Sequence, residues 1–258
     1  MFKALRRSLG LIKYRLKNQW KEWRNGREEQ FHFDIRFIEP LVRTAYYNPK
    51  PIGFSTRVML TERVVEYPLT FQALPANPTT VLDVGSGNSP LPYHLACTGH
   101  STVAVDFLSY PIQHPNLTAL RCDATKLPFR NETFRYVTAI SSLEHFGLGG
   151  YGDPILADGP LQARTEILRV LKPGGSLIVS LPVGSKRKQQ GTSQLDYHVF
   201  SRTDLKGFTK GFKISTIRFF HYIEYTWMPC SEIEAFSHDS ERERNTAIVF
   251  MRLTKPRE

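Results

Sequence analysis

Short apolar runs alternate with stretches of helical periodicity along most of this chain, and this alternation predicts an α/β fold. Continuous apolar runs indicate parallel strands that are covered on both faces of a sheet. They lie near residues 80–84, 102–106, 119–121, 136–141 and 177–181. Helical patterns over about 90–97 and 161–171 stand between them. We therefore expect a mostly parallel sheet with helices on both faces.

Two longer strand patterns close the chain, at about 214–225 and 246–253. Ser201, with Asp204 three residues later, indicates the start of a helix before them. With one terminal strand reversed, the pattern predicts a Rossmann-like, seven-stranded, mostly parallel sheet whose last strand is antiparallel. We assign this sheet to a domain spanning residues 79–258.

The first 27 residues carry the pattern of an amphipathic helix, because large apolar side chains recur there at intervals of three and four. These are Phe2, Leu5, Leu9, Ile12, Leu16, Trp20 and Trp23. A basic helix of this kind suits an anionic membrane surface, and packing on the domain or on a second chain is the alternative. Residues 28–78 read as a linker and helical cap, with a helix after Thr61 that is bent or broken at Pro68.

Positive charge is concentrated in this N-terminal extension. The chain has a formal net charge of +10, and residues 1–27 hold nine Lys and Arg against one acid. The remaining 25 basic and 23 acidic residues nearly cancel, so we expect no nucleic-acid partner. Scattered cysteines and the short apolar runs indicate neither a disulfide framework nor a membrane span. We expect a cytoplasmic protein, held at most peripherally on the inner face of a membrane.

The segment 81–88 reads as a buried strand that breaks into a tight glycine turn. Gly85 and Gly87 permit backbone angles and close approaches that a Cβ would block. The next strand ends in Asp106, about 20 residues further on, where an acid accepts hydrogen bonds from ribose hydroxyls. A dinucleotide fold places a third glycine where this chain has Pro90, which lacks an N–H for phosphate. The turn therefore favours a nucleoside without phosphates over NAD(P) or ATP.

Four ordered motifs carry a family resemblance: VLDVGSGNSP, VAVD, CDATKLPF and LKPGGSLIVSLP. Together they resemble class I S-adenosylmethionine-dependent methyltransferases, and within these the methyltransferase type 11 group that acts on small molecules. The resemblance covers residues 80–255. It implies S-adenosyl-L-methionine as the cofactor and a small-molecule acceptor, such as a saccharide or a lipid-linked metabolite.

The resemblance also implies which residues contact the cofactor. They are Asp83, Gly85, Gly87, Asn88, Asp106, Phe107, Asp123, Ala124 and Ser141. In the family pattern Asp83 lies near the methionine amino group, and Asp106 binds the ribose. Asp123 accepts the adenine amino hydrogens beside the Ala124 N–H. Two alternatives stay open: Asp83 as a structural acid of the turn, and Phe107 as the start of a helix instead of a stacking partner for adenine.

Catalysis requires a base if the acceptor is a hydroxyl. His145, with Glu144 beside it, follows the fourth strand and is the first candidate, because histidine titrates near neutral pH. In similar enzymes such a pair also orders the loop or lines the cofactor site. Tyr197 and His198 are second candidates, and the glycine-rich run 147–152 predicts a mobile loop on the acceptor side.

Other classes of protein fit less well. The segment after the fourth strand lacks the [DNS]-P-P-[YF] motif of N6-adenine methyltransferases, and Pro229-Cys230 lies outside the position that a C5-cytosine enzyme requires. Asp153 and Glu144 alone indicate no metal site. A non-catalytic binding module with a methyltransferase-like fold stays open, as does, less favourably, an NAD(P)-dependent oxidoreductase.

Overall fold

The structure is a computed structural model. It describes residues 61–257 apart from 185–186, 191–195, 224–225 and 238–246, with the backbone alone at 187–190 and Asp196. The predicted helix over 1–27 and the first part of the 28–78 segment lie outside these described residues. Within them, no helix is long and apolar enough to cross a membrane.

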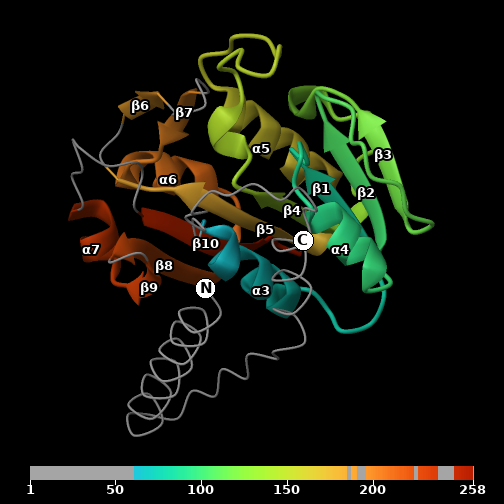
Figure 1. Cartoon of the computed structure of the whole chain (residues 1–258), viewed down its shortest axis with the longest axis horizontal. Coiled ribbons are helices and arrows are strands. Elements are labelled where there is room, and N and C mark those ends of the chain that lie inside the picture. The colour runs from blue at the N-terminus through green and yellow to red at the C-terminus, as the bar shows by residue number, and fades with distance from the viewer. Residues whose placement is uncertain (1–60, 185–186, 191–195, 224–225, 238–246, 258) are drawn as a thin grey trace, which may run out of the picture. The chain divides into compact units, whose positions relative to one another are not determined.

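An eight-stranded sheet forms the centre of the described part of the chain (Figure 1). Its strand order is β3-β2-β1-β4-β5-β10-β8-β9. The first five of these strands pair in parallel, and β10 pairs antiparallel with both β5 and β8. The strands are β1 (Thr80–Val84), β2 (Ser101–Asp106), β3 (Leu117–Arg121), β4 (Phe134–Ile140), β5 (Leu171–Pro182), β8 (Lys213–Ile223), β9 (Thr226–Cys230) and β10 (Ala247–Thr254).

The predicted α/β class and the reversed last strand are confirmed, but the predicted number of seven strands is wrong. The eighth strand arises because β8 is followed at once by β9, which pairs with it antiparallel and places Thr226 opposite Ile223. The ring of Trp227 packs 5.4 Å from that of Tyr222 across this hairpin. A separate two-stranded sheet is formed by β6 (Arg187–Gln190) and β7 (Asp196–Val199).

Helices cover both faces of the large sheet. They are α3 (Arg63–Ala73), α4 (Leu91–Cys97), α5 (Gly159–Val170), α6 (Arg202–Thr209) and α7 (Glu232–Ser237). The predicted start of α6 is confirmed, because the side chains of Ser201 and Asp204 each accept a hydrogen bond from the other's backbone N–H. Helix α3 continues through Pro68, where a bend or break was expected, and it packs on β5 and β10.

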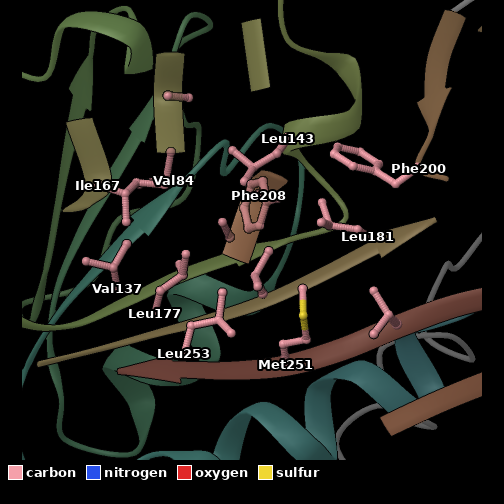
Figure 2. Packing of buried hydrophobic residues seen from close by; sticks show 14 of the residues in the cluster. Val84, Val137, Leu143, Ile167, Leu177, Leu181, Phe200, Phe208, Met251 and Leu253 are labelled. Atoms are coloured by element: carbon pink, nitrogen blue, oxygen red, sulfur yellow. The ribbon is translucent and has the colours of Figure 1, made fainter. Parts of the chain in front are cut away.

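The apolar core lies between the sheet and α5 and α6. Figure 2 shows Leu177, Leu181, Met251 and Leu253 of β5 and β10 directed toward Phe208 of α6. All five side chains are buried. Burial of such a side chain stabilises a fold by roughly 1.5–3 kcal/mol, so this layer holds the helices of one face on the strands.

The opposite face of the sheet, which α3 covers, contains a buried polar layer. Asp83 of β1 and Thr138 of β4 are register partners, and Ser180 of β5 lies opposite Ile140. Asp83, Thr138, Ser180 and Glu66 of α3 are all buried. Because β1 and β4 end at the same edge of the sheet, this polar layer leads directly to the candidate site.

Candidate cofactor and acceptor site

The glycine turn after β1 is hydrogen-bonded to β2 on one side and to the segment after β4 on the other. The Gly85 N–H donates to the Val105 carbonyl of β2 at 2.9 Å, and the Ser142 hydroxyl donates to the Val84 carbonyl at 2.9 Å. Gly85 has a φ of 77°, and a Cβ at this position would lie 2.5 Å from the Cβ of Ser142. Glycine is therefore required here for both backbone angle and space.

Asp83 lies beneath the turn and is 3% exposed. Thr138 Oγ1 donates to its Oδ1 at 2.6 Å, and Ser86 Oγ donates to its Oδ2 at 3.0 Å. Burial raises the pKa of Asp83 to about 6, against the opposing effect of these two hydroxyl bonds. The carboxylate thus joins β1, β4 and the turn, and its contact with a methionine amino group stays a prediction.

Asp106 stands at the end of β2, half-buried and directly beside the turn. Its Oδ2 accepts from the Gly87 N–H at 2.8 Å, and its Oδ1 accepts from the Leu108 N–H at 2.7 Å. Each carboxylate oxygen can accept more than one hydrogen bond. A Cβ at Gly87 would meet Asp106 Oδ2 at 3.9 Å and, beyond its chain neighbours, no other described heavy atom within 4 Å. The space that a Gly87 side chain would occupy, next to this carboxylate, is therefore open.

Three more predicted residues follow the paired ends of β2 and β3: Phe107, Asp123 and Ala124. Asp123 uses Oδ1 to accept from both the N–H and the hydroxyl of Thr125, at 2.8 and 2.7 Å, so its Oδ2 points to no described hydrogen-bond partner and suits an amino group. Ala124 is buried at the start of the short 3₁₀ helix Ala124–Lys126. The guanidinium of Arg121 lies 5.8 Å from the centre of the Phe107 ring.

A tyrosine pair supports the other end of the turn. Tyr67 of α3 is hydrogen-bonded to the Ser89 hydroxyl at 2.8 Å, and Tyr110 donates to the Ser89 carbonyl at 2.7 Å. Burial raises the pKa of Tyr110 to about 12, so both hydroxyls stay protonated at neutral pH. Neither tyrosine was predicted as part of the site. Asn88, which was predicted, is exposed in the turn.

Ser141 connects the end of β4 to α3. Its N–H donates to Ser180 Oγ at 2.9 Å, and its hydroxyl donates to Glu66 Oε1 at 2.6 Å. The backbone of Ser141 has a φ of 43°, a left-handed conformation that is uncommon outside glycine and concentrates at functional sites. Glu66 is itself fully buried and forms an ion pair with Arg63 at 2.7 Å.

Glu144 is buried in the short 3₁₀ helix Leu143–His145 and faces the same part of α3. Its Oε2 has no hydrogen-bond partner among the described residues. The pKa of Glu144 is raised to about 8, chiefly by burial and also by the carboxylates of Glu66 and Glu62, against the opposing effects of a backbone hydrogen bond and of Arg63. This carboxyl is therefore largely protonated at neutral pH when the site holds no ligand.

His145 lies among aromatic residues from two other segments. Its ring is edge-on to Tyr151 at 5.7 Å and to Tyr197 of β7 at 6.1 Å between ring centres. The structure thus brings His145, the first candidate base, close to Tyr197, one of the two second candidates. Burial raises the pKa of Tyr151, and the charges of Glu144 and Asp106 add to the rise.

The glycine-rich run is organised by Asp153. Its Oδ2 accepts from the Gly147 N–H at 2.9 Å, and its Oδ1 accepts from the Tyr151 N–H at 3.2 Å. A Cβ at Gly147 would lie 2.6 Å from the Leu156 carbonyl oxygen, so the base of the run is tightly packed. Asp153 therefore sets the position of Tyr151. The mobility expected for 147–152 stays a prediction.

These side chains fit S-adenosylmethionine. Two half-buried carboxylates stand at the ends of the neighbouring strands β2 and β3, where ribose and adenine present hydroxyl and amino donors. Gly87 leaves room for the ligand to approach Asp106. Arg63, Glu66 and Tyr67 of α3 were not predicted from the sequence to belong to the site. The sequence offered one indication of their role: Glu66 is an acid within an otherwise largely apolar stretch.

Comparison with known proteins agrees with this geometry. Residues 82–179 match a family model described as a methyltransferase domain. The chain is 37% identical over 107 residues to a demethylmenaquinone methyltransferase of Renibacterium salmoninarum, a match covering 39% of this chain and 40% of the relative. The chain thus spans about two fifths of the length of this curated relative.

Solved structures share the fold at low sequence identity. An S-adenosylmethionine-dependent methyltransferase of Methanosarcina mazei is 15% identical, with a TM-score of 0.55 over 74% of this chain and 99% of that chain. The 1,6-didemethyltoxoflavin-N1-methyltransferase of Burkholderia thailandensis, crystallised with 1,6-didemethyltoxoflavin and S-adenosylhomocysteine, is 15% identical. Its TM-score is 0.51 over 90% of this chain and 93% of that chain. At such identity, the likeness establishes the fold.

Proposed function

We propose that this chain, whose residues 82–179 match a methyltransferase domain, transfers a methyl group from S-adenosylmethionine to a small-molecule acceptor. The observation that carries the proposal is the position of Asp106. Its Oδ2 accepts a hydrogen bond from the Gly87 N–H at 2.8 Å, and the space that a Gly87 side chain would occupy beside it is open. A carboxylate at the end of the second strand accepts hydrogen bonds from ribose hydroxyls.

The protein's part in the reaction is mainly alignment. When bound, the cofactor supplies an activated methyl group as a sulfonium. Asp106 and Asp123 would hold its nucleoside, while the glycine turn lets the backbone approach it closely. Orientation of this kind and exclusion of water provide most of the acceleration in an in-line displacement.

The acceptor side is formed by His145 with Tyr151 and Tyr197. A hydroxyl acceptor must lose its proton, and His145 is the candidate base, with Glu144 next to it in the chain. The ring of His145 lies edge-on to both tyrosines, which limits its rotation and favours one orientation toward the acceptor. This role rests on geometry and on the ability of a neutral imidazole to accept a proton.

We place the acceptor among lipid-linked metabolites, with saccharides as the alternative class. The similarity to a demethylmenaquinone methyltransferase supports an acceptor with a ring and a long apolar chain. A basic amphipathic helix over residues 1–27, as the sequence predicts, would bring the domain to an anionic membrane where such acceptors reside. The proposed location is accordingly cytoplasmic and peripheral on the inner face of that membrane.

Titration of the full-length protein tests the proposed cofactor. S-adenosylhomocysteine should bind and raise the melting temperature, whereas NADH should not, because Pro90 stands at the start of α4 where a dinucleotide fold presents an N–H to phosphate. Asp106→Asn should weaken the binding of S-adenosylhomocysteine about tenfold or more, since charge-assisted hydrogen bonds are lost.

Activity is tested by incubating S-adenosylmethionine and the protein with a cell extract. S-adenosylhomocysteine should form with the wild-type protein, and much less should form with Asp106→Asn. Binding of the cofactor without any product would instead favour the non-catalytic binding module. Absence of cofactor binding by the folded protein would refute the proposal.

A further inference from the structure

The strand order determines where each part of the proposed cofactor lies. From β3 to β4 the order is β3-β2-β1-β4, and Asp123 and Asp106 follow β3 and β2. If these two residues hold adenine and ribose, the amino-acid end of the cofactor extends past β1 to the end of β4. Three strand spacings amount to roughly 14 Å, which an extended nucleoside with an amino-acid tail spans.

Asp83, at the end of β1, is already hydrogen-bonded without a ligand. Each of its two oxygens already accepts a hydroxyl hydrogen bond, from Thr138 and from Ser86. The residue is 3% exposed and belongs to the polar layer under the turn. Asp83 therefore has a complete structural role without a ligand.

The end of β4 offers a different carboxyl. Glu144 is 5% exposed, and its Oε2 is buried without a hydrogen-bond partner among the described residues. A buried oxygen of this kind costs free energy unless a donor meets it. Because folded proteins rarely leave such an atom unpaired, the geometry indicates a ligand group at this position.

The groups around Glu144 identify the charge of that ligand group. Helix α3 contributes Glu62, Arg63 and Glu66 to its surroundings, and the loop after β4 contributes Tyr151. Glu66 is already paired with Arg63 and with the Ser141 hydroxyl. Because Arg63 is already paired with Glu66, ionisation of Glu144 would leave a buried negative charge that a positively charged ligand group could balance.

We propose that Glu144, supported by Glu66, binds the ammonium group at the amino-acid end of S-adenosylmethionine, in addition to the contact that the family pattern gives to Asp83. The inference rests on the proposed function. Arg63, whose side chain is 30% exposed, is positioned to meet the carboxylate of the same amino-acid end. Glu144 is in this reading a cofactor-binding residue rather than part of an acid–base pair with His145.

Proton release accompanies this binding mode. In the free protein, burial and the carboxylates of Glu66 and Glu62 hold the pKa of Glu144 near 8. An ammonium group beside it favours the ionised carboxylate and lowers that pKa, so binding near neutral pH releases a proton from Glu144. The affinity for an ammonium-bearing ligand should therefore rise as the pH rises toward 8.

Two ligands separate the amino-acid contact from the nucleoside contact. S-adenosylhomocysteine carries the ammonium group, and 5′-methylthioadenosine has the same nucleoside thioether without it. Both are titrated calorimetrically into the wild-type protein, Glu144→Gln and the surface control Glu232→Gln. We expect Glu144→Gln to weaken S-adenosylhomocysteine binding at least about tenfold, as loss of a charge-assisted hydrogen bond does, with 5′-methylthioadenosine within about twofold of wild type.

The wild-type protein provides a second measurement that needs no variant. The binding heat of S-adenosylhomocysteine near pH 7 should depend on the ionisation heat of the buffer, whereas that of 5′-methylthioadenosine should depend on it much less. Equal effects of Glu144→Gln on both ligands, or equal proton release with both, would overturn the inference. If neither ligand binds the wild-type protein, the proposed function fails instead.

Discussion

At the scale of single residues, the site is distinguished by carboxyl groups whose pKa values are raised by burial. Asp83 and Glu144 have pKa values raised to about 6 and about 8, in both cases chiefly by burial. Asp83 is compensated by two hydroxyl donors, and Glu144 leaves one oxygen unpaired. The first arrangement is typical of a structural acid, and the second of an acid that awaits a ligand.

Glu144 should make the stability of the ligand-free protein depend on pH. Its folded-state pKa of about 8 lies above the ordinary value of 4.5, so its contribution to stability is complete below the ordinary pKa and is lost as the pH rises through 8. From about pH 5 to pH 8, the free energy of unfolding of the wild-type protein should therefore fall relative to Glu144→Gln by up to a few kcal/mol.

Urea denaturation of both proteins at several pH values measures this difference. Glu62, whose pKa is also raised by burial and by Glu66, acts in the same direction. Glu62 remains in Glu144→Gln, so the difference between the two proteins reports Glu144 together with its coupling to Glu62. Parallel stability profiles for the two proteins would show that Glu144 ionises normally in the fold.

At the scale of elements, the glycine turn and helix α3 determine how the strand ends meet. The turn is tied to β2 through Gly85 and to the segment after β4 through Ser142. Helix α3 contacts the end of β4 through the Arg63–Glu66 ion pair and Ser141. The ends of β1 and β4 are thus held together from both sides.

Gly85→Ala should cost roughly 3 kcal/mol of stability or more, because its Cβ would lie 2.5 Å from the Cβ of Ser142. Gly152→Ala is the matched control. Gly152 has the same φ of 77°, but an added Cβ there meets no described heavy atom within 4 Å, so it should cost about 1 kcal/mol from backbone strain alone. Chemical denaturation of the two variants compares these costs, and equal losses would mean that contact with Ser142 is unimportant.

At the scale of the whole molecule, the sequence divides the charge unevenly. Residues 1–27 carry nine basic residues against one acid, while the remainder is nearly neutral. The predicted helix lies outside the described residues, so its role is argued from the sequence alone. An amphipathic helix of this charge would attach the proposed enzyme to an anionic surface without changing its cofactor site.

Deleting residues 1–27 should therefore abolish binding to anionic vesicles while the affinity for S-adenosylhomocysteine persists. Replacing Lys13, Arg15 and Lys17 by Glu in the full-length chain should weaken vesicle binding at least about tenfold, because each basic residue contributes about 1 kcal/mol near such a surface. Co-sedimentation with anionic and neutral vesicles measures both effects. Vesicle binding that survives the deletion would refute the membrane role.

The sequence by itself predicted the five parallel strands, β8, β10 and helices α3 to α6 in their order, because the periodicity of burial is a local property of the chain, but it did not predict β6, β7 or α7. It also predicted the glycine turn and placed Asp106 and Asp123 at strand ends, since parallel strands bring their carboxyl ends to one edge. The hairpin of β8 and β9 was missed, because one long apolar pattern does not show where a chain reverses.

Only the tertiary structure decided which carboxyl groups are paired and which await a ligand. Ser141 and Glu66 are 75 residues apart, and their hydrogen bond exists because α3 packs over the end of β4. The same packing buries Glu144 among α3 carboxylates and leaves Asp83 satisfied by Ser86 and Thr138. Burial and hydrogen-bond partners set a pKa, and both depend on neighbours that are distant in the sequence.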